Sequence, residues 1–159
     1  MGTVQVDFQL PLRFNLSYID SNGEKKTPIL IHRALFGSFE RFIGIITEHF
    51  AGAFPVWLAP VQVKVLPISD SQKEYAEKIT ERLASKGIRV ELDDRQEKIG
   101  YKIREAQLQK VPYMLILGDK EKESGNVGVR SRKDGDIGAM SIEDFLAKLD
   151  KEVKEKIIE

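Results

Sequence analysis

The chain has 159 residues, which is enough for one ordinary domain or for two small packed units. Apolar residues make up 42% of the sequence and charged residues 31%, a balance that excludes a disordered chain and favours a globular fold. Basic and acidic residues number 25 each, so there is no overall positive field, and nucleic-acid binding needs a local basic patch.

Two absences narrow the class of protein further. The sequence has no cysteine, which excludes a disulfide framework, a thiol nucleophile and a thiolate metal site in this chain. It has neither an apolar run long enough for a membrane span nor an opening signal peptide. We therefore expect a soluble, reduced, cytoplasmic protein with no membrane or DNA partner.

Two strand patterns open the chain. Residues 3–8 alternate polar and apolar side chains, which predicts a strand. Asn22-Gly23 lies between apolar runs at residues 14–19 and 27–36, and this pair favours a hairpin because both residues tolerate positive φ. A strand that begins so close to the first residue leads us to expect that the chain is part of a larger protein.

A helix is expected after this hairpin. Gly37 ends the preceding strand, and Ser38 is a candidate N-cap. Residues 39–50 carry apolar side chains three and four positions apart, which predicts a buried helix. We place the boundary between this antiparallel α+β segment and the rest of the chain near residue 58.

The remainder follows a regular alternation of strands and helices. Strands are expected at 61–68, 88–93, 112–118 and 126–132, and helices at 70–87, 97–110 and 141–159. Ser69 or Asp70 would cap the first of these helices, and Gly87 would end it. This β-α-β-α-β-β-α order predicts a small α/β domain with helices on both faces of a mixed sheet.

Arg41 stands where the helix dipole disfavours a cation, in the first turn of the helix after Ser38. Free amides at a helix start form an anion site, and a nearby arginine adds a bidentate donor. A phosphate or carboxylate ligand is one interpretation, and a structural ion pair with Glu40 or with a carboxylate of a strand is the other. The pattern alone leaves both open.

The histidines carry less information. His32 is a lone histidine on a strand, and such residues are usually structural rather than metal ligands. His49, beside Glu48, is typical of a solvated helix end.

A basic surface is expected in the second half. Its members are Arg95, Lys98, Lys102, Arg104 and Lys110, followed by Arg130 and Arg132 on one side of a strand. An ordinary solvated surface is one interpretation. The other is a platform for RNA phosphates and unstacked bases.

Long blocks of this sequence resemble the threonyl-tRNA synthetase family, whose members are class II aminoacyl-tRNA synthetases. They include "GTVQVDF", "HRALFGSFERFIGI", "FPVWLAPVQV", "GIRVELDDRQEKIGYKIREAQLQKVPYMLILGDKE" and "VGVRSRKDGDIG". The resemblance is to the carboxy-terminal part of the family and covers essentially all 159 residues. It implies a small mixed-sheet anticodon-binding domain at residues 58–159, preceded by part of the catalytic domain at residues 1–57.

The resemblance also implies roles in the first segment. Arg41 matches the motif 3 arginine that binds the phosphates of ATP, and Thr3 and Gln5 match residues that line the substrate pocket, with Ser38 at its edge. His32 matches one of three zinc ligands, a cysteine and two histidines, that sense threonine. A site that binds the threonine hydroxyl directly rejects valine far better than an apolar pocket does.

This sequence departs from the family at several of these positions. Met1 stands where the family strand has cysteine, and motifs 1 and 2 are absent. One histidine cannot hold a stable zinc site. We therefore expect an ATP-dependent, zinc-dependent parent enzyme, a homodimer, that joins threonine to its tRNA, and a chain that cannot form threonyl-adenylate alone.

The resemblance assigns the anticodon loop of threonine tRNA to the second segment. The matching residues are Gln96, Lys98, Lys110, Glu121 and Arg130. Gln96 replaces an expected asparagine, and Lys110 replaces a common arginine, so that a charge remains but a planar fork is lost. Two alternatives are a free-standing RNA-binding accessory protein without catalysis and a purely structural or dimer-contact piece.

Overall fold

The computed structural model describes residues 2–158. The expectation drawn from Met1 concerns a residue outside this range. Two compact units are present, one ending at His49 and the other beginning at Phe50. Within the described range, no helix combines the length and apolar character needed to cross a membrane.

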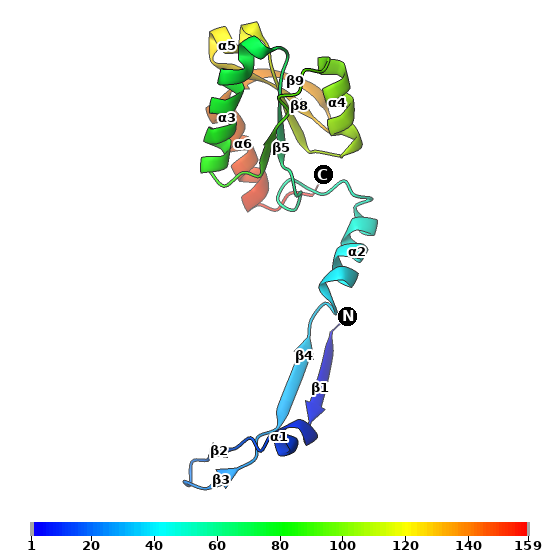
Figure 1. The fold of residues 1–159 in the computed structure, drawn as a ribbon, viewed down its shortest axis with the longest axis vertical. Helices are drawn as coiled ribbons and strands as arrows, with labels where there is room; N and C mark the ends of the chain where they lie inside the picture. The colour runs from blue at the N-terminus through cyan, green and yellow to red at the C-terminus, as the bar shows by residue number, and fades with distance from the viewer. Residues whose placement is uncertain (1, 159) are drawn as a thin grey trace. The chain divides into compact units, whose positions relative to one another are not determined.

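The first unit contains two small antiparallel pairs of strands and two helices (Figure 1). Its elements are β1 (Thr3–Asp7), α1 (Gln9–Arg13), β2 (Tyr18–Ile19), β3 (Lys25–Lys26), β4 (Leu30–Ala34) and α2 (Phe39–His49). β1 pairs with β4, and β2 pairs with β3. Gly23 has a φ of 80° in the turn between β2 and β3, so the predicted turn is present, but the hairpin joins strands of only two residues each. The strand expected at 27–36 forms β4 and pairs with β1 rather than with residues 14–19, so that part of the hairpin prediction is wrong.

The expectation of a buried helix over residues 39–50 is wrong for this structure. α2 begins after Ser38, whose hydroxyl accepts the amide of Arg41 at 3.3 Å, but none of its residues is buried and Phe39 is 84% exposed. The apolar stripe is present, but a two-stranded sheet has too little surface to cover a helix. Periodicity predicts the helix and its apolar face, and not what packs against that face.

The second unit is a five-stranded mixed sheet with helices on both faces (Figure 1). The strand order is β6 (Val90–Leu92), β5 (Val63–Pro67), β7 (Tyr113–Leu117), β8 (Asn126–Ser131) and β9 (Gly135–Ser141). The first three strands are parallel, and the last two are antiparallel to their neighbours. The predicted mixed α/β sheet is therefore confirmed.

The helices divide between the two faces of this sheet. α3 (Lys73–Ser85) and α6 (Ile142–Lys154) bury one face, where Val65 and Leu115 belong to the larger core. α4 (Ile99–Leu108) covers the other face, where Ala106 packs against Met114. Successive strand residues point to opposite faces, so both faces of the central strands are apolar and buried.

Three elements of the structure were not expected from the sequence. They are α1, α5 (Asp119–Ser124) and β9. α5 is polar on every side and β9 contains two glycines, so neither has the periodicity that reveals a helix or a strand. β9 forms because β8 offers a partner along its length, with a bulge between Val129 and Arg130.

The start of the second unit also differs from the sequence estimate. Val56 is buried in the larger core, so residues from Phe50 onward pack with the second unit. The boundary between domains near residue 58 stays a prediction.

Replacing Gly128 by alanine is expected to lower the free energy of unfolding by about 1–3 kcal/mol, because the new Cβ would lie 2.9 Å from the backbone oxygen of Ile116. Denaturant unfolding followed by the fluorescence of Trp57, the chain's one tryptophan, measures the loss. Gly100→Ala is the matched control, since Gly100 lies within α4 with open space around it and should gain up to about 1 kcal/mol. Equal stability of the two variants would contradict this account of the β7–β8 packing.

Candidate nucleic-acid interface

A cavity of about 440 Å³ lies where the parallel strands β5 and β6 end. Its lining includes Pro67, the last residue of β5, and residues 94–98, which connect β6 to α4. Ligands of open α/β sheets bind in the crevice outside the carboxyl ends of the strands. The cavity occupies that position.

The segment that follows β6 is held by a charged network. The guanidinium of Arg95 donates to both oxygens of Asp93, at 2.8 and 2.7 Å, and also to Glu105 of α4. Asp93 is buried, and its hydrogen bonds with Arg95 hold the pKa of its carboxyl below the ordinary value. The same arginine lowers the pKa of Glu105. Arg95 is therefore engaged within the protein, and its main contribution here is to fix the loop.

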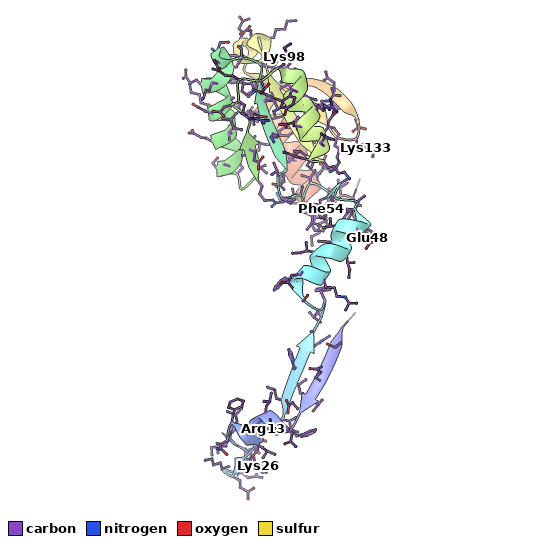
Figure 2. All side chains as sticks on the ribbon, turned by 45° about the vertical axis from the view of Figure 1, so that its right-hand side comes forward. Arg13, Lys26, Glu48, Phe54, Lys98 and Lys133 are labelled. Atoms are coloured by element: carbon purple, nitrogen blue, oxygen red, sulfur yellow. The ribbon has the colours of Figure 1, made fainter. Side chains whose placement is uncertain are left out.

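Gln96 and Lys98 are brought together at the mouth of this cavity. The side-chain amide of Gln96 donates to Asp70 at 3.0 Å, and Asp70 begins the short 3-10 helix that follows β5. Lys98 is the N-cap residue of α4, and its side chain is exposed (Figure 2). Lys98 thus presents a charge at the cavity, whereas the nearby Lys73 is paired with Asp94 at 2.9 Å, which raises the pKa of Lys73.

Lys102 does not lie on the solvent-exposed basic surface that the sequence predicted. It is 3% exposed, and its ammonium donates to the backbone oxygens of Pro67 and Asp93 at 3.1 and 3.0 Å. Its spacing of four from Lys98 does place both side chains along the cavity. Lys98 stands at the helix start and points outward, while Lys102 lies under the next turn, against the sheet.

Glu121 lies beside the same cavity. Its carboxylate accepts the amide of Gly118 at 2.9 Å, at the start of α5. A Cβ placed on Gly118 would lie 2.9 Å from the Glu121 oxygen and 3.0 Å from the side chain of Ile68, which lines the cavity. The ends of β5, β6 and β7 therefore bring Gln96, Lys98 and Glu121 to one edge of the sheet.

Lys110 lies just beyond the other end of α4, a helix about 15 Å long that begins directly after Lys98. Its ammonium donates to the backbone oxygen of Ala51, and Arg132 donates to the backbone oxygens of Phe54 and Lys110. Figure 2 shows Lys98 and Phe54 at opposite ends of the second unit. The structure thus separates Lys110 from the other candidate residues.

Arg130 lies on β8, on the face of the sheet that α4 covers. It is opposite Met114 of β7, which belongs to the core under α4, and two residues from Gly128, beside which the Glu121 carboxylate lies. Its side chain is half-buried, and among the described residues its Nε has no hydrogen-bond partner. Arg130 therefore retains donors that the protein does not satisfy.

The candidate residues of the first unit also lie in a defined arrangement. Gln5 of β1 is directly opposite His32 of β4, and both line a cavity of about 400 Å³ together with Asp7. Thr3 is exposed on the same strand as Gln5, and Arg41 is exposed in the first turn of α2. The Ser38–Arg41 contact is a helix cap, so the guanidinium of Arg41 is left to solvent.

The part of the chain that the structure describes does not by itself fit a zinc ion. It contains no group of three or more histidine, cysteine, aspartate or glutamate side chains that could hold a metal. His32 is exposed on a two-stranded sheet. Stable zinc sites use three or four protein ligands, so residues 2–158 do not supply such a site alone.

Comparison with known proteins decides the family. Residues 62–152, more than half of the chain, match the family described as "Anticodon binding domain". The chain belongs to the anticodon-binding domain family. Residues 1–50, ahead of the anticodon-binding domain, match the "tRNA synthetase class II core domain (G, H, P, S and T)".

Curated relatives include threonine–tRNA ligases. Those of Clostridium tetani and Caldanaerobacter subterraneus subsp. tengcongensis are 65% and 66% identical over 99% of this chain. The chain spans about a quarter of the length of each, 25% and 24%. The resemblance to threonyl-tRNA synthetases seen in the sequence is thereby confirmed.

Two solved structures are similar to this chain. The RNA-binding domain of threonyl-tRNA synthetase from Cryptosporidium parvum Iowa II has a TM-score of 0.77 and 39% identity, over 94% of this chain and 38% of that one. Prolyl-tRNA synthetase from Cryptosporidium parvum has a TM-score of 0.68 and 23% identity, over 97% of this chain and 35% of that one. At this identity, the similarity to prolyl-tRNA synthetase shows a shared fold only.

The sequence pattern does not reveal two features of the anticodon-binding domain. It indicates Asp70 only as a possible helix cap, whereas in the structure Asp70 also accepts a hydrogen bond from Gln96. It places Lys102 on the surface, whereas its side chain lies in the cavity wall. The available signal was the position of both residues near the ends of parallel strands, where α/β domains bind ligands.

Proposed function

We propose that this chain binds the anticodon loop of threonine tRNA and forms part of a threonine–tRNA ligase. The observation that carries the proposal is the cavity at the carboxyl ends of β5 and β6, where Gln96 and Lys98 meet, with Glu121 adjacent. Exposed amide and ammonium groups and a half-buried carboxylate around a hollow suit unstacked RNA bases, which are read by their edges. The family match and the ligase relatives support this choice.

The five candidate residues then take different roles. Lys98 contributes a charge for a phosphate, while Gln96 and Glu121 offer hydrogen bonds to base edges. Arg130 contributes its free donors to a base. Lys110 would meet RNA only on a different side of the domain, because its ammonium is bound to Ala51 at the far end of α4.

The parent enzyme, in this proposal, is a cytoplasmic homodimer that uses ATP to join threonine to its tRNA. Arg41 would bind the phosphates of ATP, and Thr3, Gln5 and Ser38 would border the threonine pocket. His32 would be one zinc ligand in that longer protein, whose other ligands this sequence does not supply. The chain alone is inactive in adenylate formation, and threonine-dependent pyrophosphate exchange above background would contradict this.

RNA binding is tested by titrating a threonine-tRNA anticodon stem-loop, and a stem-loop with a scrambled loop, at 50 to 200 mM salt. The expected result is tighter binding of the true loop by about tenfold or more, and weaker binding of both RNAs as salt rises. Salt sensitivity should be modest, because the protein has no net positive charge. Equal affinity for the two loops, or no binding, would overturn the proposal.

A further inference from the structure

A buried ammonium group lies in the wall of the RNA-binding cavity. Lys102 is 3% exposed and lines the cavity of about 440 Å³ at the ends of β5 and β6. Its Nζ donates to the backbone oxygens of Pro67 and Asp93, at 3.1 and 3.0 Å. A lysine ammonium has three N–H donors, so one donor remains.

The direction of that remaining donor is restricted. The two carbonyl oxygens lie at the carboxyl end of β5 and just after β6, so they hold the ammonium between the strands. Several other polar groups of the lining are already engaged, since Lys73 pairs with Asp94, and Gln96 donates to Asp70. A buried donor without an acceptor is costly, so a ligand that supplies an oxygen at this point is favoured.

We propose that Lys102 is a specificity-determining residue, whose third N–H donates to a carbonyl oxygen on the edge of an unstacked RNA base. This inference rests on the proposed function. The inference extends the proposed function by naming the kind of base that is read. Guanine and uracil present such an oxygen, whereas adenine and cytosine present an amino group at the corresponding position. An amino group there would face the ammonium as a second donor.

A base edge suits this position better than a phosphate does. Lys73 and Arg95, two of the cations of the lining, are already paired with Asp94 and Asp93. The carboxylates of Asp70 and Glu97 line the same cavity and disfavour a further anion inside it. Lys98, by contrast, is exposed at the rim, where a phosphate can approach from solvent. We therefore expect Lys102 to contact a base edge and Lys98 to contact a backbone phosphate of the RNA.

The test uses the full chain and stem-loops of the threonine-tRNA anticodon in which each loop guanosine is replaced in turn by 2-aminopurine, and each uridine by cytidine. Wild-type protein should lose about 5- to 100-fold in affinity at one loop position, where the base oxygen is removed. Lys102→Met should lose affinity for the unmodified loop and should no longer distinguish the modified base at that position. The protein substitution and the base substitution together form a double-mutant cycle. Coupling at one base only indicates that Lys102 reads that base, whereas a general loss of structure would lower affinity equally at every position.

Lys98→Met is the matched control. It should keep the base preference and reduce the salt dependence of binding by about one phosphate contact, whereas Lys102→Met should leave that slope unchanged. If Lys102→Met shows a folding defect by Trp57 fluorescence, the wild-type series still tests the proposal, because the proposal fails when no substituted base lowers affinity. If wild-type protein loses no more than twofold in affinity at any substituted base, the role of Lys102 is overturned and the proposed function is left intact. Failure of the wild type to bind any stem-loop overturns the proposed function instead.

Discussion

Arg130→Ala is expected to weaken binding of the threonine-tRNA anticodon stem-loop by about 1–3 kcal/mol, which is roughly 5- to 150-fold. Arg130 is half-buried on the sheet face beneath α4, and its Nε has no hydrogen-bond partner among the described residues. A guanidinium in a partly dry setting with unsatisfied donors gains more from a base edge than a solvated one does. Fluorescence anisotropy with a labelled stem-loop at fixed salt measures the change.

Two further variants separate this role from structural effects. Arg130→Lys keeps the charge but loses the planar fork, so it should recover little of the affinity if a base is read by two donors. Arg132→Ala should instead lower stability, because Arg132 donates to the backbone oxygens of Phe54 and Lys110. Unchanged affinity of Arg130→Ala for the stem-loop would remove Arg130 from the interface.

Asp93→Asn is expected to lower the free energy of unfolding by about 1–3 kcal/mol at neutral pH. Asp93 is buried and receives two hydrogen bonds from Arg95, at 2.8 and 2.7 Å. Removing its charge leaves the guanidinium with Glu105 and solvent, and the partial exposure of Arg95 keeps the loss toward the lower end of the range. Denaturant unfolding followed by Trp57 fluorescence measures it.

The same pair predicts a pH dependence. The pKa of Asp93 in the folded protein lies below the ordinary value of 3.8. The stabilisation is therefore complete above 3.8 and is lost as the pH falls through the lower folded pKa. The stability difference between wild type and Asp93→Asn should persist at pH 7 and shrink below pH 3.8, whereas a difference that grows on acidification would contradict the assignment.

Asp94→Asn provides a control at the next position. Asp94 is exposed, and its hydrogen bond with Lys73 lowers the pKa of its carboxyl. Exposed ion pairs are screened by solvent and contribute little to stability. Asp94→Asn should therefore change stability far less than Asp93→Asn does, although both carboxylates have a cationic partner.

Much of the second unit could be read from periodicity and turn chemistry. The apolar run of residues 112–118 predicted the strand β7, which is covered on both faces. Gly87, with a φ of 79°, ends α3 where the sequence placed the end of that helix. The weakly patterned elements α5 and β9 could not be predicted, because they depend on a neighbouring strand rather than on their own residues.

Part of the candidate site could also be predicted from the sequence, and part could not. Its residue types, and the likeness of "EKIGYKIREAQ" to the threonyl-tRNA synthetases, were visible in the sequence, and from them came the interpretation as an anticodon-binding surface. The same stretch could not show that Lys98 is exposed while Lys102 is buried. A spacing of four places two side chains on one helix face and says nothing of whether solvent or a sheet lies beneath each.

Sequence alone therefore determined the family, the turn at Gly23, and the helices and strands of the second unit other than α5 and β9. Tertiary structure decided which charged groups are available to a ligand. It left Lys98 exposed, bound Lys110 to the backbone of Ala51 and placed Lys102 in a cavity wall. The physical reason is that secondary structure follows from local patterns, whereas burial and hydrogen-bond partners depend on which distant segments fold against each side chain.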